Sequence, residues 1–97
     1  MTDRKTTRFN KEAIKALPKN KPVVYKILDE KNENIYTGSA KRGRAVARLR
    51  EHLPNGPDPV PGGAKVQIQQ KTSIKEAHKT EKIIIARSKP KHNKQGK

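Results

Sequence analysis

The fold of this chain is decided by residues 23–38, which read VVYKILDEKNENIYTG. The first six residues are aliphatic or aromatic apart from one lysine, and the last four contain the second of the chain's two tyrosines. The six residues between these runs are polar and rich in turn formers, so the stretch predicts a β-hairpin. Side-chain alternation puts Val23, Tyr25 and Ile27 on one face of its first strand.

Composition places this hairpin in a small and very basic chain. The 97 residues make at most one domain with a small core, and 24 Lys and Arg against 9 Asp and Glu give a net charge of +15. Such a charge favours a nucleic acid as partner, with a solubilising surface or a ribosome-bound structural role as alternatives and an anionic membrane surface less favoured. No apolar run suits a membrane span or a signal peptide, and the lack of cysteine fits a reducing interior, so we expect an intracellular protein, cytoplasmic or nucleoid-associated.

Polar segments surround the hairpin. Residues 1–9 and 94–97 are expected to be flexible. Asn10 is a candidate cap for a short helix over residues 11–17. The proline- and glycine-rich segment 54–63, PNGPDPVPGG, is predicted to form a stiff loop.

A basic helix is predicted over residues 39–53, although Gly43 blurs its start. Its apolar side chains recur at helical spacing and are expected to pack on the sheet; they are Val46, Leu49 and Leu53. Arg48 and His52 are four residues apart, so they point the same way from a neighbouring stripe. On spacing alone, a solvated basic helix that contacts phosphates without selectivity is the alternative.

A third strand and a last helix complete the predicted elements. Residues 64–70 alternate between apolar and polar side chains, which predicts a half-buried strand. Ser73 and Glu76 form a capping-box pattern, so a helix is predicted to begin at Ile74.

Glu81 is the unusual residue of this last helix. It falls on the apolar stripe formed by Ile74, Ala77, Ile84 and Ile85. A carboxylate there is costly unless it is paired, hydrogen-bonded or bound to a metal. Either Glu81 lies at the edge of the stripe and pairs with Lys75 or Lys82, or it is a metal ligand or catalytic acid/base.

Several of these residues suit phosphodiester hydrolysis. That reaction needs an activated water, positive charge at the phosphate and a stabilised leaving oxygen. Arg48 offers a bidentate phosphate clamp. One Mg²⁺ bound to a carboxylate can supply positive charge at the phosphate and stabilise the leaving oxygen. Tyr25 and Tyr36 offer hydroxyls on a rigid sheet, but a tyrosine can act as a base only if cations or a metal lower its pKa.

Six motifs follow one another along residues 22–93: Tyr25, Tyr36-Thr37-Gly38, Arg48, His52, Glu81 and Pro90-x-x-Asn93. Together they resemble the GIY-YIG endonuclease superfamily, especially its small stand-alone members and the N-terminal nuclease domain of the bacterial protein that makes the incisions in excision repair. The resemblance implies one α/β (α+β) domain over residues 1–97, with a three-stranded antiparallel sheet flanked by helices. The order helix-strand-strand-helix-strand-helix, predicted from the residues themselves, agrees with it.

The resemblance also implies a function: a metal-dependent DNA endonuclease of low intrinsic sequence specificity, acting in DNA repair or recombination. Tyr25 matches the tyrosine proposed to accept a proton from, or to orient, the attacking water. Tyr36 matches the tyrosine that hydrogen-bonds at the scissile phosphate, and Gly38 lets the backbone approach closely.

The helices supply the other residues that the resemblance implies. Arg48 matches the arginine that stabilises the phosphate. His52 matches a position that the family fills with His or Tyr. Glu81 matches the sole protein ligand of one Mg²⁺ or Mn²⁺ ion. Asn93 matches an asparagine that braces the site.

The chain departs from the family pattern in places. Val23 and Val24 replace the usual Gly-Ile pair, and Ser39 stands where a lysine often follows the second motif, so that Lys26 or Lys41 would have to substitute. Arg44 is the alternative to Arg48 if the helix register differs. The residues expected to contact nucleic acid are Lys26, Gly38, Ser39, Lys41, Arg42, Arg44 and Arg50.

A second hypothesis comes from another functional class, a basic nucleic-acid-binding module that keeps the fold but does not cut. Glu81 argues against it, because a pure binder gains nothing from an acidic residue facing an anionic ligand. The oligomeric state and a partner protein that supplies specificity are left open.

Overall fold

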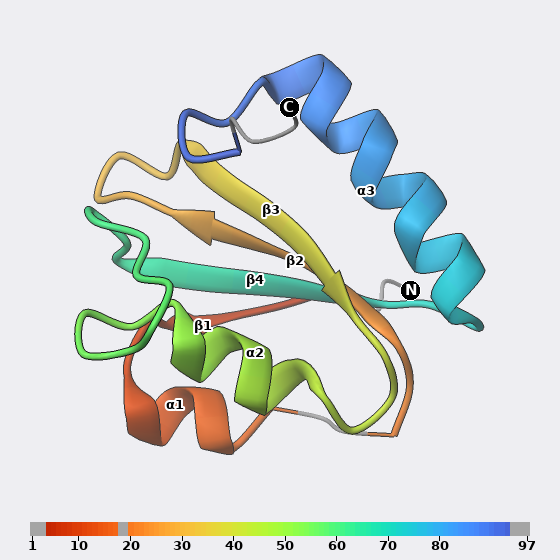
Figure 1. Ribbon diagram of the computed structural model, residues 1–97, viewed down its shortest axis with the longest axis horizontal. Coiled ribbons are helices and arrows are strands. Elements are labelled where there is room, and N and C mark those ends of the chain that lie inside the picture. The colour runs from red at the N-terminus through yellow and green to blue at the C-terminus, as the bar shows by residue number, and fades with distance from the viewer. Residues whose placement is uncertain (1–3, 18–19, 94–97) are drawn as a thin grey trace.

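The computed structural model describes residues 4–17 and 20–93. Its elements are β1 (Arg4–Arg8), α1 (Lys11–Lys15), β2 (Val23–Leu28), β3 (Asn34–Ala40), α2 (Ala45–Glu51), β4 (Lys65–Gln70) and α3 (Ile74–Ser88). Within this part of the chain, the strands form one four-stranded antiparallel sheet in the order β1-β4-β2-β3 (Figure 1). The described residues therefore form a small α+β domain with three helices.

The predicted hairpin is confirmed as β2 and β3. Its turn is closed by Asp29, whose Oδ1 accepts hydrogen bonds of 2.9 Å from the backbone N–H groups of both Lys31 and Glu33. Asn32 adopts a φ of 66°, a left-handed conformation that asparagine tolerates better than most residues. The turn chemistry of the sequence thus sets the hairpin that carries both tyrosines.

The prediction of a three-stranded sheet is wrong, because residues 4–8 add a fourth strand. β1 pairs with β4 in antiparallel register, from Arg4 opposite Gln69 to Arg8 opposite Lys65. The segment lacks the apolar alternation that marks a strand, so its order comes from the backbone ladder and not from buried side chains. Residues 4–9 were expected to be flexible, and this expectation is wrong because they form and follow a paired strand. Residues 1–3 and 94–97, which were also expected to be flexible, lie outside the described structure.

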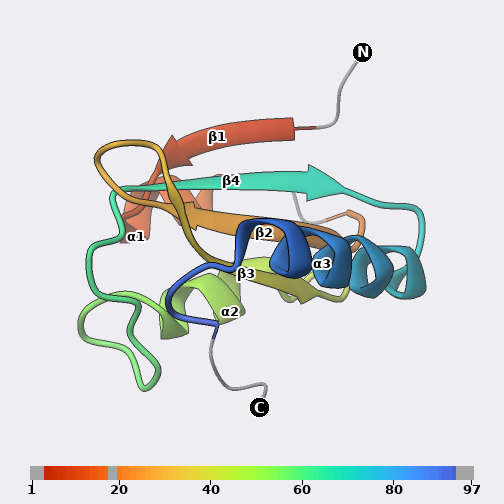
Figure 2. The same ribbon diagram turned by 90° about the horizontal axis from the view of Figure 1, so that it is seen from above.

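Helices cover both faces of the sheet. Figures 1 and 2 show α3 beside β2 and β3 on one face, and α1 and α2 on the other. The main core lies under α1 and α2, where Ile14 and Leu49 pack against Tyr25 and its strand neighbours. Val24 and Ala77 are buried apart from that cluster, on the α3 face.

The cap positions of the helices match the sequence pattern. The backbone N–H of Ala13 donates to Asn10 Oδ1 at 2.8 Å, and that of Glu76 donates to Ser73 Oγ at 3.1 Å. The predicted start of α3 at Ile74 is confirmed. α1 ends at Lys15, slightly before the predicted end at residue 17.

The helix predicted over residues 39–53 is shorter than expected. Ser39 and Ala40 continue β3, and α2 begins only at Ala45. Between them Gly43 has a φ of 80°, a left-handed conformation that an α-helix does not allow. Leu49 is fully buried as predicted, and Val46 and Leu53 pack against the core.

None of the helices in residues 4–17 and 20–93 combines the length and the apolar character that a membrane crossing requires.

Gly38 is the position where the sheet approaches its own tyrosine. Gly38 lies opposite Tyr25 in the β2–β3 ladder, and a Cβ at Gly38 would sit 2.6 Å from both Cζ and the hydroxyl oxygen of Tyr25. Only a residue without a Cβ lets the ring of Tyr25 lie flat over the β3 backbone. This contact fixes where the tyrosine hydroxyl can be.

We expect Gly38→Ala to destabilise the protein by about 1–3 kcal/mol, because the added methyl group overpacks the core against a ring that cannot move freely. Urea unfolding measures this loss. In a Tyr25→Ala background the same substitution should cost far less, because the contacted atoms are gone. An equal cost in both backgrounds would contradict the contact.

Candidate functional site

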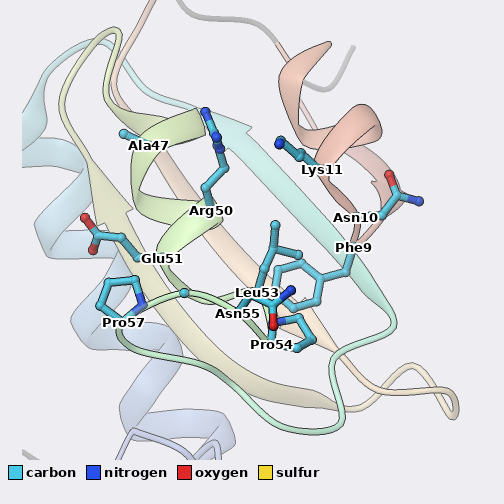
Figure 3. Close-up of a pocket in the computed structure, with 11 residues that line it drawn as sticks. Phe9, Asn10, Lys11, Ala47, Arg50, Glu51, Leu53, Pro54, Asn55 and Pro57 are labelled. Atoms are coloured by element: carbon cyan, nitrogen blue, oxygen red, sulfur yellow. The ribbon is translucent and has the colours of Figure 1, made fainter.

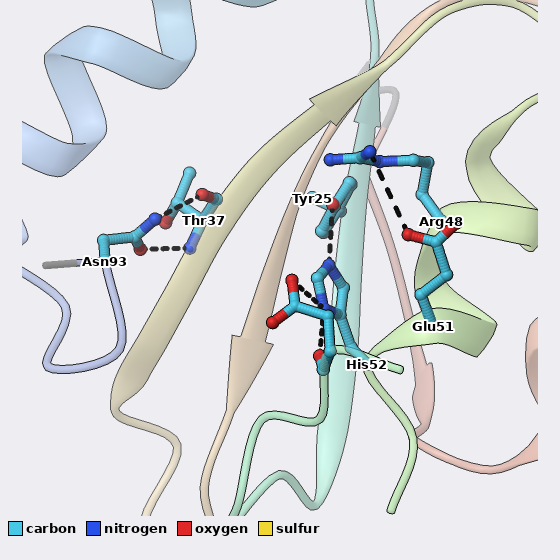
Figure 4. A network of polar contacts seen from close by, with 7 residues as sticks. Tyr25, Thr37, Arg48, Glu51, His52 and Asn93 are labelled. Atoms are coloured by element: carbon cyan, nitrogen blue, oxygen red, sulfur yellow. Dashed lines mark hydrogen bonds and ion pairs between the residues drawn. The ribbon is translucent and has the colours of Figure 1, made fainter. Parts of the chain in front are cut away.

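A buried hydrogen bond between Tyr25 and His52 forms the centre of the candidate site (Figure 4). The Tyr25 hydroxyl lies 3.1 Å from His52 Nε2, and both side chains are fully buried. On the other side of the ring, His52 Nδ1 lies 2.9 Å from the backbone carbonyl oxygen of Asp58. A carbonyl can only accept, so Nδ1 carries the proton; in the neutral ring Nε2 then accepts from Tyr25.

Two elements hold His52 in this orientation. The residue ends α2, and its own carbonyl accepts a 3.0 Å hydrogen bond from the backbone N–H of Val60. The predicted stiff loop over residues 54–63 thus folds back onto the helix end and brings Asp58 to the imidazole. Asp58 was missed from the sequence; its backbone carbonyl accepts from the ring, and its carboxylate oxygen Oδ2 lies 3.7 Å from the same Nδ1.

Arg48 lies against the Tyr25 hydroxyl from the preceding turn of α2 (Figure 4). Its Nη1 is 4.0 Å from Glu51 Oε1 in a half-exposed pair, which contributes little to stability. Its Nε is a buried donor without a hydrogen-bond partner in the described part of the chain. The guanidinium is therefore positioned beside the tyrosine with one donor still to be satisfied.

The environment of Tyr25 is the reverse of what base catalysis was expected to need. Burial raises the pKa of Tyr25 above its usual value, and the neighbouring Tyr36 adds to this rise. Arg48 lowers the pKa of Tyr25, but not enough to cancel burial. The lowered pKa that a tyrosine base would need is therefore not found at Tyr25, since desolvation of the phenolate dominates.

Tyr36 completes an aromatic cluster with these two residues. Its ring centroid lies 4.7 Å from that of His52 and 6.2 Å from that of Tyr25. Tyr36 is only half-buried, so it links the buried Tyr25 to the surface. Burial is also the main cause that raises the pKa of Tyr36, followed by the negative charge of Asp58.

Glu81 approaches from the other side of β3. Ser39 Oγ donates a 2.6 Å hydrogen bond to Glu81 Oε1 and lies 3.0 Å from His78 Nδ1. The carboxylate is partly buried and contacts Ser39 and His78; it forms no ion pair with Lys75 or Lys82. Its negative charge contributes to the raised pKa values of both tyrosines, so it lies within their electrostatic reach.

Two adjacent residues of β3 face the two groups of side chains described above, one group on each face of the sheet. Gly38 faces Tyr25, and Ser39, the next residue, holds Glu81 on the opposite face. A pocket of about 350 Å³ connects the two sides, with Arg48 and His78 both in its wall. Its complete lining is Ser39, Ala40, Lys41, Arg44, Arg48, Ile74 and His78.

Asn93, which was predicted to brace the site, lies along the outer edge of β3. Its Oδ1 accepts from the backbone N–H of Thr37 at 2.6 Å, and its Nδ2 donates to the Thr37 carbonyl at 2.9 Å (Figure 4). The backbone N–H of His92 also donates to the carbonyl of Ile35 at 3.0 Å. The segment after α3 therefore satisfies backbone groups that an edge strand would leave open.

The remaining predicted nucleic-acid contacts are distributed unevenly. Lys41 and Arg44 line the pocket beside Arg48, whereas Lys26 follows Tyr25 in β2 and so lies on the other face of the sheet. That position rules out Lys26 as a direct neighbour of the Tyr25 hydroxyl. Arg42 and Arg50 are exposed and do not line this pocket.

Arg50 lines a separate pocket of about 750 Å³ between α1, α2 and the loop that follows α2 (Figure 3). Phe9, Leu53 and Pro54 give that pocket an apolar floor. It contains none of the six residues predicted to be catalytic.

No family model and no curated protein matches the sequence.

The raised pKa values predict how the protein behaves in alkali. The chain has two tyrosines and no tryptophan, so tyrosinate absorbance reports Tyr25 and Tyr36 alone. The folded pKa values lie above the unfolded value of about 10, so this contribution to stability is full below pH 10 and is lost as pH rises through the folded values. In the native protein we expect absorbance to rise at higher pH than in denaturant; a tyrosine that titrates below its unfolded value would contradict the burial effect.

Proposed function

We propose that this protein is a metal-dependent DNA endonuclease that hydrolyses phosphodiester bonds with little intrinsic sequence preference. The observation that carries the proposal is the convergence on one short stretch of β3. Arg48 and the Tyr25–His52 hydrogen bond lie on the side of β3 that Gly38 faces, and Glu81 is held on the other side by Ser39, the next residue. The fold alone would not require a guanidinium, an oriented imidazole and a carboxylate within one residue step of the same strand.

Phosphate binding is the role of Arg48. A phosphate in the pocket that Arg48 shares with Lys41 and Arg44 would give its unpaired Nε–H an acceptor. Charge-assisted hydrogen bonds of this kind strengthen as negative charge develops on the phosphate oxygens in the transition state. A phosphate ligand in this pocket also agrees with the net charge of +15, which favours polyanionic ligands in general.

Proton transfer is the role of Tyr25 and His52. With its raised pKa, Tyr25 stays protonated at neutral pH and donates to His52 Nε2. It can accept a proton from water only while it passes its own proton to His52, so the two residues act as a relay. Arg48 lies against this hydroxyl and also lines the pocket proposed for the phosphate.

Glu81 fits a hard divalent cation such as Mg²⁺ or Mn²⁺, because it is a partly exposed carboxylate that accepts a hydrogen bond from Ser39, a residue of the pocket wall. No group of three or more His, Cys, Asp or Glu side chains among the described residues is placed to hold a metal ion, so an ion at Glu81 would keep most of its water. When bound, such an ion supplies positive charge to the phosphate and stabilises the leaving oxygen.

The alternative is a basic module that binds nucleic acid without cutting it. The complete burial of Tyr25 favours this alternative, because in this conformation its hydroxyl does not reach solvent. Nicking of supercoiled plasmid, with Mg²⁺ or Mn²⁺ and with chelator, distinguishes the two functions. Metal-dependent nicking supports the endonuclease, and DNA binding without nicking supports the module.

Glu81→Gln keeps the shape of the side chain and removes its charge. We expect it to abolish nicking while the fold stays intact, and DNA binding should hold or tighten because a negative charge near phosphate is lost. Glu76→Gln, on an exposed position of the same helix, is the matched control and should cut normally. Nicking by the Glu81→Gln protein at the wild-type rate would refute the role of Glu81.

Arg48→Ala and Arg44→Ala separate chemistry from general charge. Each removes one positive charge from α2 or its cap, but only Arg48 lies against Tyr25. We expect Arg48→Ala to slow single-turnover cleavage on the order of 100-fold with little change in DNA affinity, and Arg44→Ala to change both only slightly. The opposite ranking would show that Arg44 and not Arg48 contacts the scissile phosphate.

A further inference from the structure

His78 was not among the predicted site residues, yet it lies at the centre of the polar contacts on the α3 side of β3. His78 and Glu81 are three residues apart on α3, so they project from one face of the helix. The two side chains meet at one atom of the neighbouring strand, because Ser39 Oγ lies 3.0 Å from His78 Nδ1 and 2.6 Å from Glu81 Oε1.

The spacing of the two donor atoms is that of neighbouring ligands of one ion. His78 Nδ1 and Glu81 Oε1 are 3.6 Å apart. Two metal bonds of about 2.1 Å at a tetrahedral angle put their donor atoms about 3.4 Å apart. A cation could therefore bind between these atoms with only a small adjustment of the side chains.

Accessibility favours a ligand role over a buried structural role. The His78 side chain is 58% exposed and that of Glu81 24% exposed. His78 also lines the pocket that contains Arg48, Lys41 and Arg44, so a cation here would face the position proposed for the phosphate. An ion pair that only stabilised the helix would need neither Ser39 nor this pocket.

We propose that His78 and Glu81 together bind one divalent transition-metal ion, with Ser39 as the hydrogen-bond partner that aligns the carboxylate. This inference rests on the proposed function and sets its metal preference. An imidazole nitrogen suits Mn²⁺, Co²⁺ or Zn²⁺ better than Mg²⁺, which prefers oxygen ligands and its own water. In the metal-free protein Ser39 Oγ donates to Glu81 and so accepts from His78 Nδ1–H. To bind the ion through Nδ1, the imidazole gives up its contact with Ser39 and carries its proton on Nε2 instead.

Mn²⁺ binding to the protein alone, without DNA and without an affinity tag, tests the site. Electron paramagnetic resonance measures free Mn²⁺, and spin-echo modulation detects an imidazole nitrogen bound to the ion. We expect His78→Ala to weaken Mn²⁺ binding on the order of tenfold or more and to remove the nitrogen signal, while an excess of Mg²⁺ competes poorly.

His92→Ala is the matched control. His92 is another accessible histidine, and its Nε2 contacts the backbone carbonyl of Pro61, away from Glu81. Its removal should leave Mn²⁺ affinity and the nitrogen signal unchanged. Wild-type protein without a nitrogen signal, or equal Mn²⁺ affinity in wild-type and His78→Ala proteins, would overturn the site.

Plasmid nicking with the same proteins separates this inference from the nuclease. If the wild type cuts DNA but His78→Ala leaves Mn²⁺ affinity unchanged, the two-ligand site is wrong and the endonuclease stands. If Mn²⁺ binding depends on His78 but no DNA is cut, the site stands and the endonuclease is wrong.

Discussion

The hydrogen bond between the Tyr25 hydroxyl and His52 is the interaction on which the rest of this structure depends. A phenol hydroxyl buried in an apolar core is unfavourable unless it finds a partner. Here the partner is a histidine at the end of α2, 3.1 Å away, and the loop carbonyl of Asp58 fixes which of its nitrogens accepts. The packing of the core and the tautomer of a buried imidazole are thus set by the same contact.

β3 extends this arrangement to the opposite face of the sheet. Gly38 makes room for Tyr25 on one side, and Ser39 holds Glu81 and His78 on the other. Because successive residues of a strand point to opposite faces, two groups of different chemistry lie within one residue step of each other. Asn93, from the segment after α3, hydrogen-bonds the backbone at the outer edge of the same strand.

Local patterns in the sequence predicted the hairpin, the cap of α3 and the burial of Leu49, because each depends on neighbouring residues. β1 could not be predicted in this way, since RKTTR has no apolar alternation and gains its order from pairing with the distant β4. The contact between Asn93 and β3 fits the role that the family resemblance implied, although the family itself remains a prediction.

The electrostatics of the site were harder to predict from the sequence than the identity of the residues that form it. A tyrosine base would need cations to lower its pKa, whereas burial of the Tyr25 ring dominates and raises it. The hydrogen bond to His52 comes from the backbone carbonyl of Asp58, and no residue pattern reveals such a contact. His78 did leave a signal, because a histidine three residues before Glu81 shares its helix face, but an exposed histidine in so basic a helix is easily taken for a solvated side chain.

The measurement that tests the account most directly is a double-mutant cycle on single-turnover DNA cleavage with Tyr25→Phe and His52→Gln. Both single variants should slow cleavage severely, and the double variant should be no slower than the worse single one, because the two residues form one proton relay. Losses that multiply would show that the residues act independently. Wild-type protein that cuts no DNA with Mg²⁺ or Mn²⁺, or single variants that cut as fast as wild type, would contradict the proposed nuclease site.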